Sequence, residues 1–138
     1  MPDLIRQTIN LKAKLEDVYQ WAEDPTQGEL VAPAKESSDV TRDKLGRVTA
    51  YKTKRGEFTY SLHNYPRYWI GQYNWRGWRA NCEVRLESFG EAWTRMTVEI
   101  DLQPQRFMAR VQSSMTRFKT NRYLKDRLVA AAQKFHTA

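Results

Sequence analysis

The alternation of side chains in two neighbouring segments constrains this chain more than any other feature. Residues 78–87 and 92–102 carry mostly apolar side chains at even positions and mostly charged or polar ones at odd positions. A period of two is typical of β-strands with one buried face, and such strands form antiparallel sheets that are covered on one side. Because even residues must oppose even residues, the connecting loop needs an odd number of residues. We therefore predict a three-residue hairpin loop at 89–91, with Gly90 at a positive φ.

Further strands are indicated on the N-terminal side of this pair. Residues 5–12 alternate in the same way, and turn residues divide the stretch from 37 to 103 at intervals typical of an antiparallel meander. Between these two regions, Leu15, Val18 and Ala22 recur at helical spacing. We expect a short helix that ends near Asp24-Pro25, because a residue before proline leaves the α region. We expect residues 26–36 to form a loop or a second short helix.

A long helix is predicted at the C-terminus, because residues 105–136 follow Pro104 and contain neither proline nor glycine. At about 100° per residue its apolar side chains fall on two neighbouring arcs, with the changeover near Asn121-Arg122. The first arc holds Phe107, Met108, Val111, Met115 and Phe118, and the second holds Leu124, Leu128, Ala131, Ala132 and Phe135. We expect a bent helix, or two halves that pack on different partners.

The positive charge of the protein is concentrated in this same C-terminal segment. The 138 residues include 23 lysines and arginines and 16 acids, for a net charge of +7. Residues 105–138 hold eight bases and one acid, so they account for all of that charge. A possible partner for this helix is therefore an anionic surface, either membrane or RNA, bound weakly; the alternative is a solvated face.

Composition excludes several other classes of protein. Mean hydropathy is −0.78, and no stretch approaches the ~20 apolar residues of a membrane span. The first residues lack the basic and apolar runs of a secretory signal. The single cysteine, Cys82, cannot form an internal disulfide, so we expect a cytoplasmic protein. Two histidines and one cysteine are too few for a structural zinc site, and we predict neither a metal nor a cofactor.

The order of predicted elements resembles the helix-grip fold of the START/pollen-allergen/polyketide-cyclase superfamily (SRPBCC). The resemblance rests on the strand at 5–13, the helix at 15–25 with Val18-Tyr19 and Asp24-Pro25, the Tyr65-Pro66 turn and the hairpin at 88–94. It implies a single α+β domain over residues 1–138. In that fold a curved antiparallel β-sheet is wrapped around a long C-terminal α-helix, with a short helix pair after the first strand. It also implies a cavity between sheet and helix that binds a small hydrophobic or aromatic molecule.

The candidate ligand-binding residues come from the aromatic-rich stretch at 65–78, the strand before it, and the C-terminal helix along its first arc, at whose angular position Arg122 also lies. On the sheet they are Tyr60, Trp69, Tyr73, Trp75 and Trp78, and on the helix they are Phe107, Val111, Met115, Phe118 and Arg122. Rigid aromatic walls with polar edges suit such a cavity, and the Arg122 guanidinium suits a carboxylate or phenolate. The alternatives are a packed aromatic core, an RNA-stacking surface and a snorkelling arginine.

Three functions remain open at this point. The first is carriage of a small hydrophobic or aromatic ligand, and the second is a polyketide cyclase/dehydratase-type enzyme whose catalytic residues the sequence leaves unknown. The third is an interaction protein that uses its basic helix. Alternation in the strand at 58–64 predicts that His63 faces solvent and that Asn64 lies on the apolar side with Tyr60. Cys82, set between Ala80 and Val84, is expected to be a small buried hydrophobe.

Overall fold

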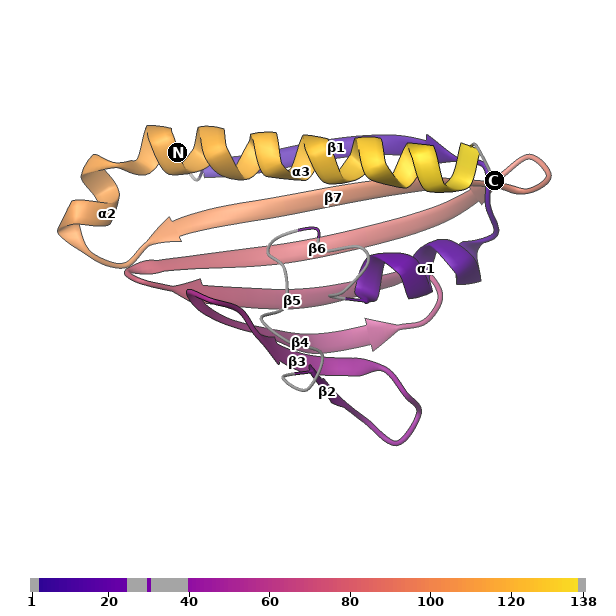
Figure 1. Cartoon of the computed structure of the whole chain (residues 1–138), viewed down its shortest axis with the longest axis horizontal. Coiled ribbons are helices and arrows are strands. Elements are labelled where there is room, and N and C mark those ends of the chain that lie inside the picture. The colour runs from indigo at the N-terminus through magenta and orange to yellow at the C-terminus, as the bar shows by residue number, and fades with distance from the viewer. Residues whose placement is uncertain (1–2, 25–29, 31–39, 137–138) are drawn as a thin grey trace.

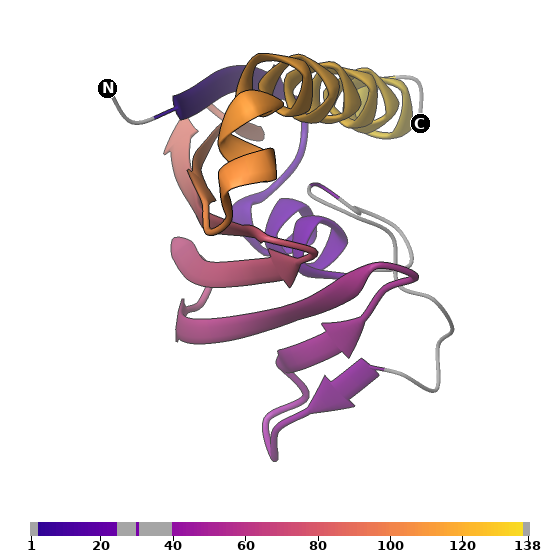
Figure 2. The ribbon, with the colours of Figure 1, turned by 90° about the vertical axis from the view of Figure 1, so that its left-hand side faces the viewer.

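One curved antiparallel sheet forms the body of the protein. The computed structural model describes residues 3–24, 30 and 40–136. Its seven strands lie in the order β1-β7-β6-β5-β4-β3-β2, and α1 and α3 lie against one face of the sheet (Figures 1 and 2). Their bounds are β1 Asp3–Leu11, β2 Val40–Arg42, β3 Val48–Lys52, β4 Gly56–Asn64, β5 Tyr68–Trp75, β6 Trp78–Phe89 and β7 Trp93–Pro104. The predicted α+β helix-grip layout is confirmed.

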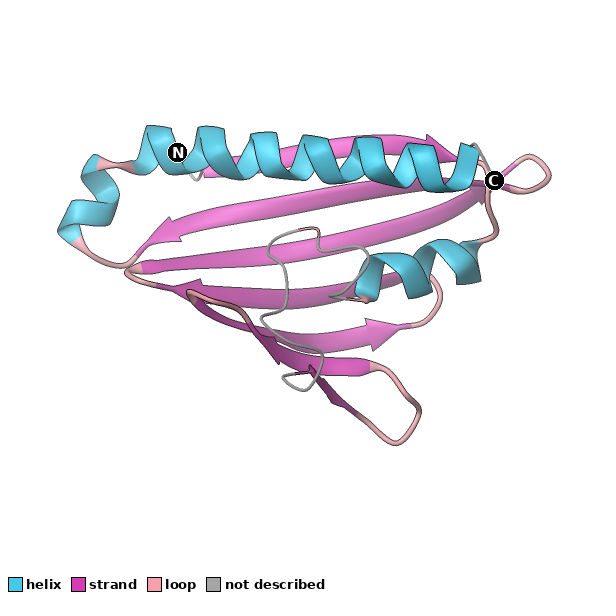
Figure 3. Cartoon of the chain, viewed as in Figure 1, coloured by secondary structure: helices cyan, strands magenta, loops and turns pink. Residues whose placement is uncertain are grey.

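Three helices complete the described structure (Figure 3): α1 spans Leu15–Glu23, α2 Phe107–Val111 and α3 Ser113–His136. The second short helix considered at 26–36 lies, except for Leu30, outside the described residues. The C-terminal helix is interrupted at Gln112 and not near Asn121-Arg122, where the change of apolar arc predicted a bend. Instead, α3 continues without a break through 121–122. Because an uninterrupted helix can lay only one face on a sheet, the second arc is mostly buried and the first arc is left exposed.

The β6–β7 hairpin confirms the predicted register and shifts the loop by one residue. Even residues oppose even residues along the pair, as in Cys82 opposite Ile100. Phe89 pairs with Trp93, so the three-residue loop comprises 90–92 and not 89–91. Gly90 has φ +59, as expected, and Ala92 also adopts a positive φ. Between β5 and β6 a two-residue turn places Trp75 opposite Trp78, so both side chains lie on the same face of the sheet. A longer loop at this turn, which the sequence also allows, would place Trp75 on the outer face.

A bulge in β4 corrects the expected orientation of its last residues. Tyr60 pairs with Gly71 and Leu62 pairs with Ile70, so Ser61 is an extra residue in the ladder. One extra residue reverses the alternation beyond it. His63 therefore faces the core and not the solvent, whereas Leu62 and Asn64 are exposed. The prediction that Asn64 lies on the apolar side with Tyr60 was wrong for the same reason.

The core lies between the sheet and the two longer helices. From α1 it receives Val18, Tyr19, Trp21 and Ala22, and from α3 it receives Leu124, Leu128 and Ala131. An edge contact between the rings of Trp21 and Phe135, with centroids 5.9 Å apart, joins α1 to the end of α3. Cys82 is buried in this core, and burial raises the pKa of its thiol to about 12, as suits a small hydrophobe.

Candidate ligand-binding site

Seven aromatic side chains form a continuous layer on the concave face of β3–β6. This aromatic wall consists of Tyr51, Phe58, Tyr60, Trp69, Tyr73, Trp75 and Trp78, and the pair of Phe58 and Tyr73, with centroids 6.4 Å apart, joins its two parts. Neighbouring rings touch throughout, because alternation puts one aromatic of each strand opposite the next across the ladder. The structure therefore brings together the five sheet residues that the sequence predicts as ligand-binding.

Close packing fixes the geometry of this wall. The Phe58 ring lies directly over Gly71, where even a Cβ atom would collide with it. Tyr73, Trp75 and Trp78 form a nearly parallel stack with centroid separations of 4.8 and 6.0 Å. Such offset stacks are favourable beyond the area that they bury. A glycine is thus required at position 71 of β5, because the Phe58 ring of β4 occupies the space of a side chain there.

The members of the wall differ in accessibility. Trp69, Tyr73 and Trp78 are buried, whereas Tyr60 and Trp75 are only half-buried. The Tyr60 hydroxyl donates to the carbonyl oxygen of Glu23 at 2.9 Å, and the hydroxyls of Tyr73 and Thr53 hydrogen-bond at 2.6 Å. Burial raises the pKa of both tyrosine hydroxyls, so they stay protonated. Tyr60 and Trp75 are consequently the side chains of the wall that another molecule can reach.

The helix half of the predicted site is placed differently. Phe107 and Val111 lie on α2, Met115 and Phe118 lie on the first turns of α3, and all four are exposed. Arg122 is exposed as well. Their part in ligand binding stays a prediction, because all five side chains are exposed and none of them has a ring contact, hydrogen bond or ion pair with the wall among the described residues.

A polar cluster adjoins the wall at the end covered by α1. It consists of Tyr19 and Glu23 from α1, Arg47 beside β3 and His63 from β4. Arg47 Nη1 lies 2.9 Å from Glu23 Oε1, and the guanidinium also lies over the Tyr65 ring, 4.3 Å from its centroid. Burial raises the pKa of Glu23, and the positive charge of Arg47 partly opposes that rise.

The hydrogen bonds of this cluster define which tautomer the neutral imidazole of His63 adopts. Its Nε2 lies 2.6 Å from the carbonyl oxygen of Val48, which can only accept, so Nε2 carries a hydrogen. In the neutral ring Nδ1 then accepts from the Tyr19 hydroxyl at 2.6 Å. Tyr60 stacks on the other side of the imidazole, with centroids 5.0 Å apart. The cluster and the wall are therefore one contiguous layer.

Sequence reasoning missed this cluster for two reasons. His63 reaches it through the β4 bulge, which no residue pattern announces. Glu23 was detectable, since it follows Tyr19 by four residues and so shares the buried face of α1. Arg47 joins them only through tertiary folding.

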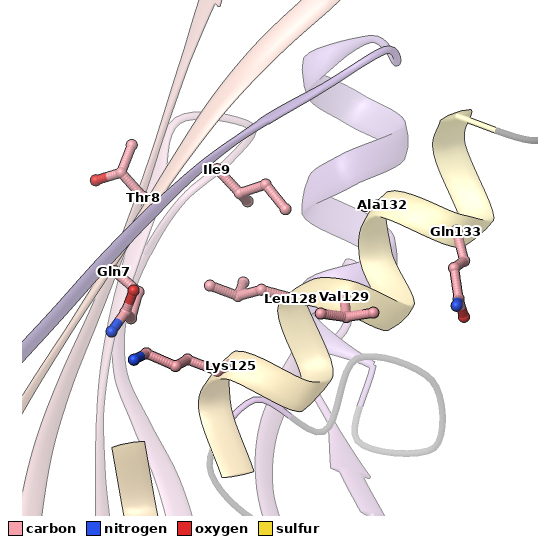
Figure 4. A pocket seen from close by; sticks show the side chains of 8 residues that line it. All are labelled: Gln7, Thr8, Ile9, Lys125, Leu128, Val129, Ala132 and Gln133. Atoms are coloured by element: carbon pink, nitrogen blue, oxygen red, sulfur yellow. The ribbon is translucent and has the colours of Figure 1, made fainter. Parts of the chain in front are cut away.

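Two hollows lie elsewhere among the described residues. A groove of about 570 Å³ runs between the edge strand β1 and α3, lined by Gln7, Thr8, Ile9, Lys125, Leu128, Val129, Ala132 and Gln133 (Figure 4). A smaller hollow of about 180 Å³ lies against β5, β6, β7 and β1, beside Glu83, Glu99 and Asp101. Within the described chain, no helix is long and apolar enough to cross a membrane. Histidine, cysteine and acidic side chains form no metal-binding group in that same part.

Comparison with known proteins establishes the fold. Neither a family model nor a curated protein matches the sequence. Among solved structures, a START superfamily protein from Mycobacterium smegmatis is similar with a TM-score of 0.64 at 10% identity, covering 95% of this chain and 97% of that one. Truncated norcoclaurine synthase from Thalictrum flavum gives 0.60 at 10% identity, covering 96% and 92%. CalU16 from Micromonospora echinospora gives 0.51 at 15% identity, covering 96% and 87%. The chain thus has the START-type helix-grip fold.

Proposed function

We propose that the concave face of the sheet binds a small hydrophobic or aromatic molecule against the aromatic wall. The observation that carries this proposal is the contiguous layer of seven rings, of which Tyr60 and Trp75 keep accessible surface. The similarity to START-type structures supports a ligand at this face of the fold. The buried rings form a rigid base, while the two half-buried rings contact the ligand.

Physical chemistry favours this class of ligand over a polar one. Aromatic rings offer large apolar area and lose little conformational freedom on binding, because their neighbours already hold them. The two nearest hydroxyls are protonated and engaged, so the wall itself carries no charge. A flat apolar or aromatic molecule would contact the accessible part of Trp75, the middle ring in the stack of Tyr73, Trp75 and Trp78.

A titration with the fluorescent aromatic anion 1-anilinonaphthalene-8-sulfonate tests this proposal. The native protein should enhance dye emission with micromolar affinity, and Trp75→Ala should weaken that affinity about tenfold or more. Trp93→Ala is the matched control, since Trp93 lies on the opposite face of the sheet. Native mass spectrometry should then detect a co-purifying small molecule in the native protein. Equal dye affinity in the two variants would overturn the location of the site.

The polar cluster favours a second candidate function, proton-transfer chemistry of the cyclase/dehydratase type. Tyr19, Arg47 and His63 converge beside the wall with a buried carboxylate, and such sets can move protons between a bound substrate and the protein. Tyr60 links the two regions, because its ring is part of the wall and stacks on the imidazole of His63. In this candidate the wall folds a reactive chain, and the Tyr60 hydroxyl exchanges its hydrogen bond to the Glu23 carbonyl oxygen for one to the carbonyl oxygen of the substrate.

Comparing binding with turnover separates the two candidates. A reactive poly-β-ketone should cyclise faster with the native protein than in buffer, and Tyr60→Phe should abolish the acceleration while it preserves dye binding. Tyr68→Phe, which removes a hydroxyl from the other face of β5, should leave both properties intact. An absence of acceleration by the native protein leaves ligand carriage and removes the enzyme candidate.

A further inference from the structure

We propose that the junction of α2 and α3 docks this protein on an anionic membrane surface. The elbow surface consists of Phe107, Met108 and Val111 on α2 and Met115 and Phe118 on α3. It lies at the end of the molecule opposite α1, where α2 turns away from the long helix (Figure 1). This inference is independent of the ligand proposed for the aromatic wall.

The exposure of these five side chains requires an explanation. Between 59% and 76% of each is accessible to solvent, although all are large and apolar and lie within twelve residues. Single exposed apolar residues are ordinary, whereas five large ones on two successive helices, so close in sequence, indicate an interaction site. The elbow is not a loose end: Ala109 is buried beneath it, and the amide of Gln105 donates to the Gly77 carbonyl oxygen at 2.6 Å.

The charges around the elbow identify the kind of partner. Residues 105–125 contain no acid, and their six bases, Arg106, Arg110, Arg117, Lys119, Arg122 and Lys125, are all exposed. Apolar side chains between exposed bases are the pattern of a helix that lies in the interface of a negatively charged bilayer. The apolar groups enter the headgroup region while the bases stay beside lipid phosphates and carboxylates.

Two other partners fit these observations less well. A second copy of the chain would bring six bases against six like charges with no acid between them, and that arrangement is repulsive. A nucleic acid would satisfy the charge, but its bases stack on aromatic rings, and three of the five apolar residues are methionine or valine. A membrane surface satisfies both the apolar area and the charge.

Sedimentation with vesicles tests the apolar part of the proposal. The full chain should bind vesicles of 70% phosphatidylcholine and 30% phosphatidylserine and should not bind pure phosphatidylcholine vesicles. Met115→Ser with Phe118→Ser should weaken that binding about tenfold or more, since both side chains lose the apolar area that would be buried. The matched control is Leu45→Ser with Leu62→Ser, which removes two exposed leucines outside the elbow surface and should change nothing.

Charge reversal tests the electrostatic part. Arg110→Glu with Lys119→Glu should weaken vesicle binding at least tenfold, because each base near such a surface contributes about fivefold. Lys44→Glu with Lys54→Glu changes the net charge equally in turns outside the elbow and should have little effect. Sodium chloride at 0.5 M should release the native protein. Circular dichroism should show that all four variants are folded, which the exposure of every replaced side chain favours.

A labelled variant keeps the test independent of vesicle recovery. Cys82 is buried, so a polarity-sensitive dye attached to Phe118→Cys reports only on the elbow. Its emission should shift to the blue with the anionic vesicles, and a dye on Leu45→Cys should not shift. Equal binding of neutral vesicles, no vesicle binding at all, or preferential retention of polyuridine RNA that survives the serine changes would each overturn the proposal. So would a dimer in sedimentation velocity that the serine changes dissociate.

Discussion

Apolar side chains of the same helix are buried at one end of the molecule and exposed at the other. At the α1 end, Leu124, Leu128 and Ala131 of α3 are buried against the sheet, and Phe135 meets Trp21 of α1. At the elbow end, Met115 and Phe118 of the same helix are exposed. Both halves show apolar residues at helical spacing. The difference teaches that the partner of a helix face, and not its apolar pattern, decides whether that face stabilises the fold.

The largest test of this contrast is a matched pair of truncations within α3. Leu124→Ala should lower the free energy of unfolding by about 2–5 kcal/mol, because a fully buried side chain leaves a cavity. Phe118→Ala should change it by less than about 0.5 kcal/mol, although it removes more atoms. Chemical denaturation measures both. Similar losses for the two variants would show that the elbow half is also packed.

The hairpin glycines at the two ends provide the next comparison. Gly90→Val should cost about 1–2 kcal/mol, because φ is +59 there, although open space surrounds the added side chain. Gly77, in the turn beside the elbow, has φ +76, and a Cβ there would lie 3.2 Å from Cδ of Arg106. Gly77→Val should therefore cost about 1 kcal/mol more. Equal losses in denaturation would mean that Arg106 moves aside freely.

A smaller effect is expected from pH, and it belongs to the α1 end alone. Burial raises the folded-state pKa of Glu23 above its ordinary value of 4.5, so the folded protein holds more protons than the unfolded chain between those two values. The free energy of unfolding should fall as pH rises from 4.5 through the raised pKa, by at most about 1.4 kcal/mol per pH unit.

Glu23→Gln removes the titrating group, so the difference between variant and native stability should change across this pH range. Glu16→Gln is the control, because that side chain is exposed on the same helix. Thermal melts at a series of pH values measure both. A Glu23→Gln profile parallel to that of the native protein would contradict the assigned environment of the carboxyl group.

The smallest effect should come from enlarging the elbow. Val111→Trp should change dye affinity at the aromatic wall by less than twofold, because Val111 is exposed on α2. The same change should strengthen binding to anionic vesicles by adding interfacial aromatic area. A strong loss of dye binding would instead return the α2 residues to the ligand site, as the sequence predicts.

The contrast between the two ends also explains how far the sequence can be interpreted. Strand alternation fixes which residues of one strand share a face, so the even-to-even register of β6 with β7 follows from the residues alone. The face that Trp69, Tyr73 and Trp75 share with Trp78 depends on the length of the turn between β5 and β6, which only the structure gives. The partner of the first α3 arc does not follow, because periodicity contains no information on what lies opposite. Phe118 and Leu124 look equally buried on a helical wheel, and only the placement of β1 separates them.

The prediction for the polar side of the candidate site was wrong because of one extra residue in β4. Ser61 is an ordinary strand residue with no glycine or proline beside it, yet the bulge there turns His63 inward. Bulges are set by how two strands fit over their whole length, and local sequence does not encode that fit. The group of Tyr19, Glu23, Arg47 and His63 therefore becomes visible only in three dimensions.

The place of β1 beside β7 has a consequence for the order in which the chain acquires its structure. β1 precedes the other described strands in the sequence, but its neighbour in the sheet is the last of them, with Asp3 opposite Leu102. Closing so long a loop costs more entropy than forming the hairpins between β4 and β7, which join residues close in sequence. The buried half of α3 rests against β1 and has no complete docking surface until that closure occurs. We therefore expect β1 and the buried half of α3 to become ordered together, after the hairpins between β4 and β7.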